Sequence, residues 1–203
     1  MKKIICYGDS NTFGFNPKNA SRYDENNRWT GILQKQLEGK YEIIEEGCCD
    51  RTGFAINSKG DLYSAQLHFP SVLSNIEAND ILIIAIGTND LQFLYSITND
   101  EIKAGLEKLI DLAQTKTKSI IVIPPVVLNK KILDGYFKCQ FDEKSIIKSQ
   151  EVQKVYEQTA KEKHCLLFDI NTFAKPSDWD GLHYDRPEHK LIAEMLLNML
   201  VKI

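Results

Sequence analysis

The sequence predicts an α/β fold in which helices cover both faces of a parallel sheet. Five short segments are apolar at nearly every position, and helical patterns lie between them. Strands that are apolar on both faces are typical of a parallel sheet buried on both sides. Because strands that alternate with helices join through right-handed crossovers, we expect a three-layer α/β/α sandwich.

Each predicted strand is rich in β-branched and aliphatic residues. The strands span residues 3–7, 42–45, 81–86, 119–123 and 165–169. We assign them the flavodoxin-like order 2-1-3-4-5, in which the first and third strands are neighbours. Ligands of such sheets bind where the strand order reverses, so the turns after Tyr7 and Ile86 are expected to hold the functional site.

Two helical patterns are the clearest. Residues 98–101 have the spacing of a capping box, and apolar positions then repeat at helical intervals. Near the C-terminus Pro187 suits a first helical position, and an apolar face follows it, with His189 expected on the polar side. Shorter helical patterns occupy residues 30–37 and 143–161. The apolar faces of the two clear helices comprise Ile102, Leu106, Leu109, Ile110 and Ala113, and Leu191, Ile192, Met195, Leu196, Met199 and Leu200.

Composition is that of an ordinary globular protein, and residues 1–203 are expected to form one domain. A chain of this length buries roughly 70% of the surface that its unfolded form exposes. Its 25 Lys and Arg against 28 Asp and Glu leave a net charge of −3, which argues against nucleic-acid binding. The apolar runs are far shorter than the ~20 residues of a membrane span, and no signal peptide is evident. We expect a cytoplasmic protein that binds no membrane.

The five cysteines are expected to be buried free thiols. Their number is odd, Cys48 and Cys49 are adjacent, and no C-x-x-C spacing occurs. The histidines show no metal-ligand spacing either. No metal or other cofactor is therefore expected.

Three turns that are distant in the chain carry side chains suited to chemistry. Ser10 comes directly after the first strand, and Asn89 follows the third. Asp180 lies three residues before His183, a spacing that lets the carboxylate hold one ring nitrogen while the other accepts a proton. Taken singly, each turn also fits a plain capping or Asx turn. Together they supply the nucleophile, amide donor, base and orienting acid that acyl transfer requires.

These turns make the sequence resemble the SGNH, or GDSL, hydrolase superfamily. The family's four blocks match, in order and over the whole chain, Gly8-Asp9-Ser10, the 47–52 region, Gly87-Thr88-Asn89-Asp90 and Asp180-Gly181-Leu182-His183. Segments 28–31 and 44–52 look most similar to the bacterial arylesterase and acyltransferase branch.

The resemblance implies a serine esterase that cleaves small carboxylic esters through an acyl-enzyme intermediate, with acyl transfer as a further activity. Ser10 would be the nucleophile, His183 the base and Asp180 the orienting acid. The implied oxyanion hole consists of the N–H of Ser10, an N–H of the second block and the side chain of Asn89.

Two positions depart from the family pattern. The leucine that usually follows the serine is Asn11, and the second-block glycine whose N–H donates falls on Asp50. A backbone N–H does not depend on the side chain, so Asp50 is expected to complete the oxyanion hole. Its carboxylate would oppose the developing charge unless it turns away or pairs with a cation such as Arg51.

The substrate pocket is expected to be lined by Asn11, Phe13, Trp29, Phe137 and Phe141. The last two belong to the loop at residues 130–143, which is too apolar for a purely solvated connection. A lid or acyl-pocket wall and a contact within a homo-oligomer are equally good interpretations of this loop. Short acyl esters, acetylated sugars and thioesters all remain open as substrates.

Two other functions fit the same fold. Residues 10–14 could cradle the phosphate of FMN, as in flavodoxins, but this interpretation gives Asn89, Asp180 and His183 no role. A catalytically silent SGNH-fold binding protein would carry the same motifs, and only an assay separates it from an enzyme.

Overall fold

A computed structural model describes residues 1–202 of the chain. It contains a five-stranded parallel sheet of order β2-β1-β3-β4-β5, which confirms the predicted fold class and strand order. The strands are β1 (Lys2–Gly8), β2 (Tyr41–Gly47), β3 (Ile81–Ala85), β4 (Ser119–Ile123) and β5 (Leu166–Leu167).

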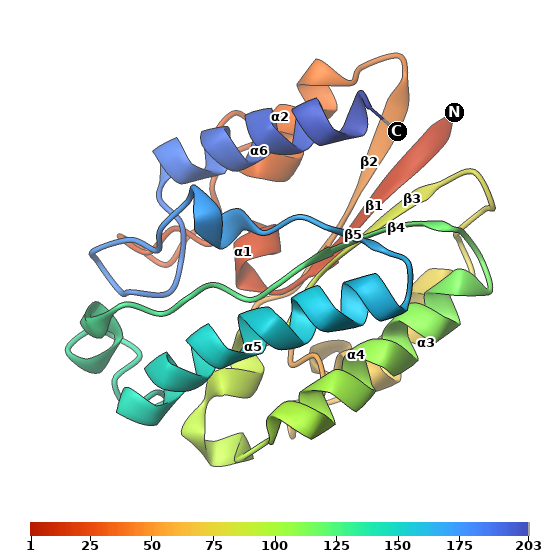
Figure 1. Cartoon of the computed structure of the whole chain (residues 1–203). Helices are drawn as coiled ribbons and strands as arrows, with labels where there is room; N and C mark the ends of the chain where they lie inside the picture. Colours follow the sequence, from red (N-terminus) through yellow and green to blue (C-terminus); the bar gives the residue numbers. More distant parts are fainter. Residues whose placement is uncertain (203) are drawn as a thin grey trace.

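Helices cover both faces of the sheet. They are α1 (Ser10–Phe13), α2 (Trp29–Gln36), α3 (Ala65–Leu73), α4 (Asn99–Gln114), α5 (Glu143–Glu162) and α6 (Arg186–Leu200). Short 3-10 turns lie at η1 (Asp61–Tyr63), η2 (Asn89–Leu91), η3 (Phe93–Tyr95), η4 (Lys130–Leu133) and η5 (Ile170–Thr172). Figure 1 shows α2 and α6 on one face and α3, α4 and α5 on the other.

Local sequence accounts for where the long helices begin. Thr98 and Glu101 form the predicted capping box of α4, in which each side chain bonds to the other residue's backbone N–H. Asp142 and Ser145 form a second box at the start of α5. All five apolar residues expected on the inner face of α4 are buried.

The inner face of α6 differs from the prediction. His189 is fully buried rather than on the polar side, because it lies one helical turn before Ile192 and Ala193, which face the sheet. Met195, expected in the apolar face, is 40% exposed.

Two further elements differ from the sequence-based expectation. Helix α3 lies outside the helical patterns expected from the sequence, and it contains Pro70, which removes one helical hydrogen bond. Strand β5 has only two of the five predicted residues. It ends early because the Asp169 side chain accepts the N–H of Asn171 and starts the 3-10 turn η5.

All five cysteines are free thiols, as predicted, although Cys6 is the one that is fully buried. Within residues 1–202, no three His, Cys, Asp or Glu side chains gather closely enough to hold a metal ion. None of the helices described there has both the length and the apolar character that crossing a membrane demands.

Candidate active site

The site lies where β1, β2 and β3 end side by side. Gly8, the last residue of β1, is in register with Gly47 of β2 and Ala85 of β3. A Cβ on Gly8 would lie 2.1 Å from Thr12 Oγ1, and one on Gly47 would lie 2.3 Å from the N of Phe13. Glycine at these two strand ends therefore lets α1 sit directly on the sheet edge.

Ser10 is the first residue of α1, and its position is set by the residue before it. The Asp9 side chain caps the helix by accepting the N–H of Asn11 at 3.0 Å. Asp9 is buried, and burial raises the pKa of its carboxyl group. In the first helical turn, the N–H of Ser10 has no acceptor within the helix and stays available to a ligand.

Ser10, His183 and Asp180 form a hydrogen-bonded chain. Ser10 Oγ lies 2.8 Å from His183 Nε2, and His183 Nδ1 lies 2.7 Å from Asp180 Oδ2. The other carboxylate oxygen of Asp180 accepts the N–H groups of Leu182 and His183 at 2.9 and 3.0 Å. Burial alone would raise the pKa of Asp180, but its hydrogen bonds outweigh burial and hold that pKa below its usual value.

Asn11 joins the turn that carries His183 to the nucleophile turn. Its side chain donates to the carbonyl of Leu182 and accepts the N–H of Tyr184, both at 3.2 Å. Asn11 was expected to line the substrate pocket, but it is not among the residues that line the cavity containing Ser10. Its two amide hydrogen bonds instead link the turn of Ser10 to the turn of His183.

Asn89, in η2, is oriented by two hydrogen bonds. Its Nδ2 donates to the carbonyl of Arg51 at 3.0 Å, and its Oδ1 accepts from Gln92 Nε2 at 3.1 Å. An amide nitrogen carries two hydrogens, so one N–H of Asn89 is left for a ligand.

Asp50 has a left-handed backbone with φ of +64°, a conformation that glycine adopts most readily. Its side chain pairs with Lys59, whose Nζ lies 2.6 Å from Asp50 Oδ2. Pairing with Arg51, one of the alternatives expected from the sequence, does not occur. The Arg51 guanidinium is buried under the loop, where it donates to the carbonyls of Leu62 and Gly8.

Of these residues, Ser10, Asp50, Asn89 and His183 line one cavity of about 290 Å³. Aromatic rings form part of its wall, because the ring centroids of Phe15 and Phe137 lie 4.3 and 5.4 Å from that of His183. The lining residues are Ser10, Phe15, Ala20, Cys49, Asp50, Lys59, Asn89, Tyr136, Phe137, Gln140, Leu182 and His183. The Ser10 hydroxyl, the His183 imidazole and the Asn89 amide thus face one space large enough for a small molecule.

The chain matches the model of the GDSL-like lipase/acylhydrolase family over residues 6–189. It belongs to this family. The native aryl esterase of M. smegmatis is similar, with 26% identity, a TM-score of 0.90 and coverage of 100% of this chain and 99% of that one. A carbohydrate acetylesterase from Sinorhizobium meliloti is 25% identical, with a TM-score of 0.89 and coverage of 100% and 99%. No curated protein matches the sequence. This GDSL-family protein is a carboxylic ester hydrolase.

Besides Asn11, three more of the predicted pocket residues lie outside this cavity of the hydrolase. Phe141 is 2% exposed and belongs to the hydrophobic core, and Trp29 is also buried. Phe13 packs instead beneath the guanidinium of Arg22, which lies 4.7 Å from the ring centroid. Phe13, the last residue of α1, thus points away from the cavity, a direction that sequence spacing alone does not specify.

Several residues of the cavity wall were not evident from the sequence. Phe137 lies there as expected, with Tyr136 and Gln140 of the same loop. Phe15, Ala20 and Lys59 were not predicted. Among these three, Phe15 alone could have been suspected from the sequence, because it is an aromatic residue close after Ser10, next to Gly14, which ends α1.

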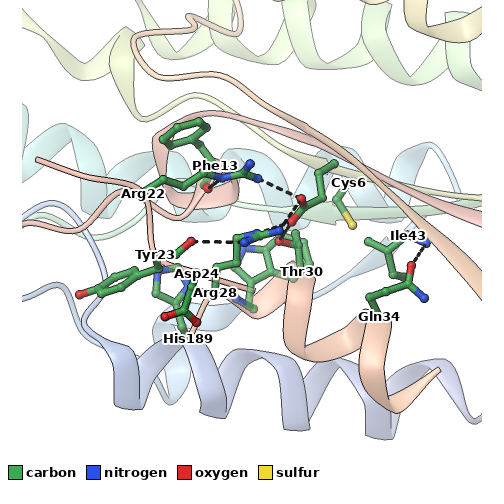
Figure 2. Close-up of polar contacts among 12 residues, drawn as sticks. Cys6, Phe13, Arg22, Tyr23, Asp24, Arg28, Thr30, Gln34, Ile43 and His189 are labelled. Carbon is green, nitrogen blue, oxygen red and sulfur yellow. Dashed lines mark hydrogen bonds and ion pairs between the residues drawn. The ribbon is translucent and has the colours of Figure 1, made fainter. Parts of the chain in front are cut away.

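In this hydrolase, the carboxylate of Glu45 holds the segment that contains Phe15 and Ala20 against the sheet. Glu45 on β2 accepts from Arg22 at 3.0 Å, from two nitrogens of Arg28 at 2.6 and 2.9 Å, and from Thr30. Arg22 also donates to the carbonyl of Phe13 at 2.8 Å. Figure 2 shows Arg22, Arg28 and Thr30 converging in this cluster beside Phe13. The aromatic wall is thus tied to the strand from outside the cavity.

Proposed function

We propose that this protein hydrolyses small carboxylic esters with Ser10 as nucleophile, His183 as base and Asp180 as orienting acid. The observation that carries the proposal is the continuous hydrogen-bond chain from Ser10 Oγ through the imidazole to Asp180, at 2.8 and 2.7 Å. Its serine end opens into the cavity of about 290 Å³. Such a chain is the arrangement by which serine hydrolases activate a hydroxyl.

Acylation follows from this arrangement. Ser10 Oγ attacks the ester carbonyl carbon while its proton passes to His183 Nε2, and the carbonyl oxygen becomes an oxyanion. The N–H groups of Ser10 and Asp50 and the side chain of Asn89 would stabilise that charge. The bond to the alcohol oxygen then breaks, and the departing alcohol takes the proton from His183.

Deacylation repeats these steps with water as the nucleophile. Water gives a proton to His183 and attacks the acyl carbon, and collapse of the second intermediate releases the acid and returns the proton to Ser10. An alcohol in place of water would give a new ester instead, so acyl transfer is the same chemistry with a different acceptor.

The substrate we propose is an ester with a short acyl chain. A cavity of this volume accommodates a small acyl group and part of an alcohol. The aryl esterase and the carbohydrate acetylesterase among the similar structures make aryl acetates and acetylated sugars the first substrates to assay. No observation favours binding of FMN, since residues 10–13 of the candidate phosphate loop form α1 and the Ser10 hydroxyl is hydrogen-bonded to His183.

The test is hydrolysis of p-nitrophenyl acetate by Ser10→Ala, with Ser71→Ala as the control because Ser71 is an exposed serine on α3. We expect a loss of about 10³-fold or more for Ser10→Ala and none for the control. A fluorophosphonate should add one mass equivalent at Ser10. Retained activity in Ser10→Ala would contradict the mechanism, and inactivity of the wild-type protein on a panel of esters would favour a silent binding protein.

A further inference from the structure

The ion pair between Asp50 and Lys59 stands inside the cavity that holds the reacting groups. Both residues line it together with Ser10, Asn89 and His183. The two side chains are 42% and 56% exposed, so the pair lies at the solvent-facing side of the cavity.

The side chain of Asn57 organises the 50–60 segment so that Lys59 lies against Asp50. Asn57 donates from its side chain to the carbonyl of Asp50 at 2.8 Å and accepts the N–H of Lys59 at 3.0 Å. Ser64 further accepts the N–H of Asn57 at 2.6 Å. One amide therefore sets the left-handed turn at Asp50 and the position of the lysine together.

A carboxylate next to an oxyanion hole has an electrostatic cost. The charge on the substrate oxygen is negative only in the transition state, so a nearby negative charge slows the reaction without weakening ground-state binding. Asp50 has the backbone conformation of the glycine that it replaces, and within residues 1–202 no acceptor takes its N–H. The useful N–H and the unfavourable carboxylate thus belong to the same residue.

We propose that Lys59 is a positioning residue that acts through Asp50: it neutralises the carboxylate and draws it away from the developing oxyanion. This inference rests on the proposed function, because it assumes that the oxyanion forms beside Ser10 and Asn89. The ammonium and the carboxylate are at ion-pair distance, and the pairing raises the pKa of Lys59, so the ammonium stays charged throughout the neutral range.

The experiment is a double-mutant cycle on ester hydrolysis with Lys59→Met, Asp50→Asn and both together. Asparagine tolerates the left-handed backbone at position 50. The Lys59 side chain is exposed, so we expect the protein with Lys59→Met to fold normally. We expect Lys59→Met to lower kcat about 5- to 10-fold with little change in KM, because solvent screens the uncovered charge. The double variant should return to within about 2-fold of wild type, since neither charge remains.

Two controls separate charge from structure. Lys103 forms a comparable ion pair with Glu162 at 2.8 Å on the surface of α4 and α5, so Lys103→Met should leave kcat unchanged. The loss in Lys59→Met should shrink between about 50 mM and 500 mM NaCl, as expected for a screened charge.

Three outcomes would overturn the inference. They are an unchanged kcat in Lys59→Met, a double variant no faster than Lys59→Met, or a rise in KM alone, which would make Lys59 a substrate contact. Failure of the proposed function would be recognised separately, because Ser10→Ala would then keep its activity whatever the Lys59 variants do.

Discussion

Asn89 uses one amide hydrogen inside the protein and leaves the other for the substrate. In Asn89→Ala the free donor is lost, and we expect kcat to fall about 10²- to 10³-fold while KM changes little. The reason is that the amide acts on a charge that exists only in the transition state. Steady-state kinetics on a soluble ester measures both constants.

Gln92→Ala is the matched variant for this prediction. It removes the hydrogen bond to Asn89 Oδ1 but keeps the donor, so it should cost much less than Asn89→Ala. An Asn89→Ala enzyme with a raised KM and normal kcat would assign the residue to ground-state binding instead.

The segment between α1 and α2 depends on Glu45, because its two arginine partners hold the carbonyls of Phe13 and Tyr23. The hydrogen bonds from Arg28 and Thr30 outweigh burial and hold the pKa of Glu45 below its usual value, so the carboxylate is charged in the folded protein. We expect Glu45→Gln to lower the free energy of unfolding by about 1–3 kcal/mol, since it leaves a half-buried Arg28 without its anion. Urea unfolding measures this loss.

The same variant should also raise KM, because Phe15 and Ala20 lie on the segment that loosens. Glu162→Gln breaks an exposed pair and should change unfolding by no more than about 0.5 kcal/mol. Equal effects of the two substitutions would show that the Glu45 cluster is an ordinary surface contact.

Across the whole molecule, a buried neutral histidine makes stability depend on pH. His189 is fully buried against Tyr23 in the helical layer, and burial lowers its pKa to about 3 from an ordinary value of 6.5. Because the unfolded chain binds this proton more readily, the contribution of His189 is complete above about pH 6.5 and is lost as the pH falls toward 3. The loss over that window is at most ~5 kcal/mol.

His189→Asn tests this dependence. Asn Oδ1 can accept the N–H of Trp29 in place of His189 Nδ1, which accepts it at 3.4 Å, but it does not titrate. The variant should be less stable at pH 7, yet its unfolding free energy should change less between pH 7 and pH 4 than that of the wild type. Parallel slopes would mean that other groups dominate acid unfolding.

Sequence patterns were sufficient for the sheet because each strand is a short apolar run and parallel order follows from alternation with helices. The convergence of Ser10, Asn89 and His183 on one cavity was also predictable, since they lie in turns directly after strands or before α6. What could not be predicted depends on side-chain direction. Phe15, just after α1, lines the cavity whereas Phe13, inside α1, does not, and Lys59 folds back onto Asp50. Both arrangements are set by contacts between segments.

The two glycines at the ends of β1 and β2 have a consequence for changing this enzyme's substrate range. Any side chain at Gly8 or Gly47 would collide with α1 within 2.3 Å, so these two positions under the helix of Ser10 require glycine. Other parts of the cavity wall come from loop segments outside the five-stranded sheet, at Phe15, Ala20 and residues 136–140. Libraries for new specificity should therefore hold both glycines fixed and randomise these loop positions, where sequence can diversify without moving Ser10.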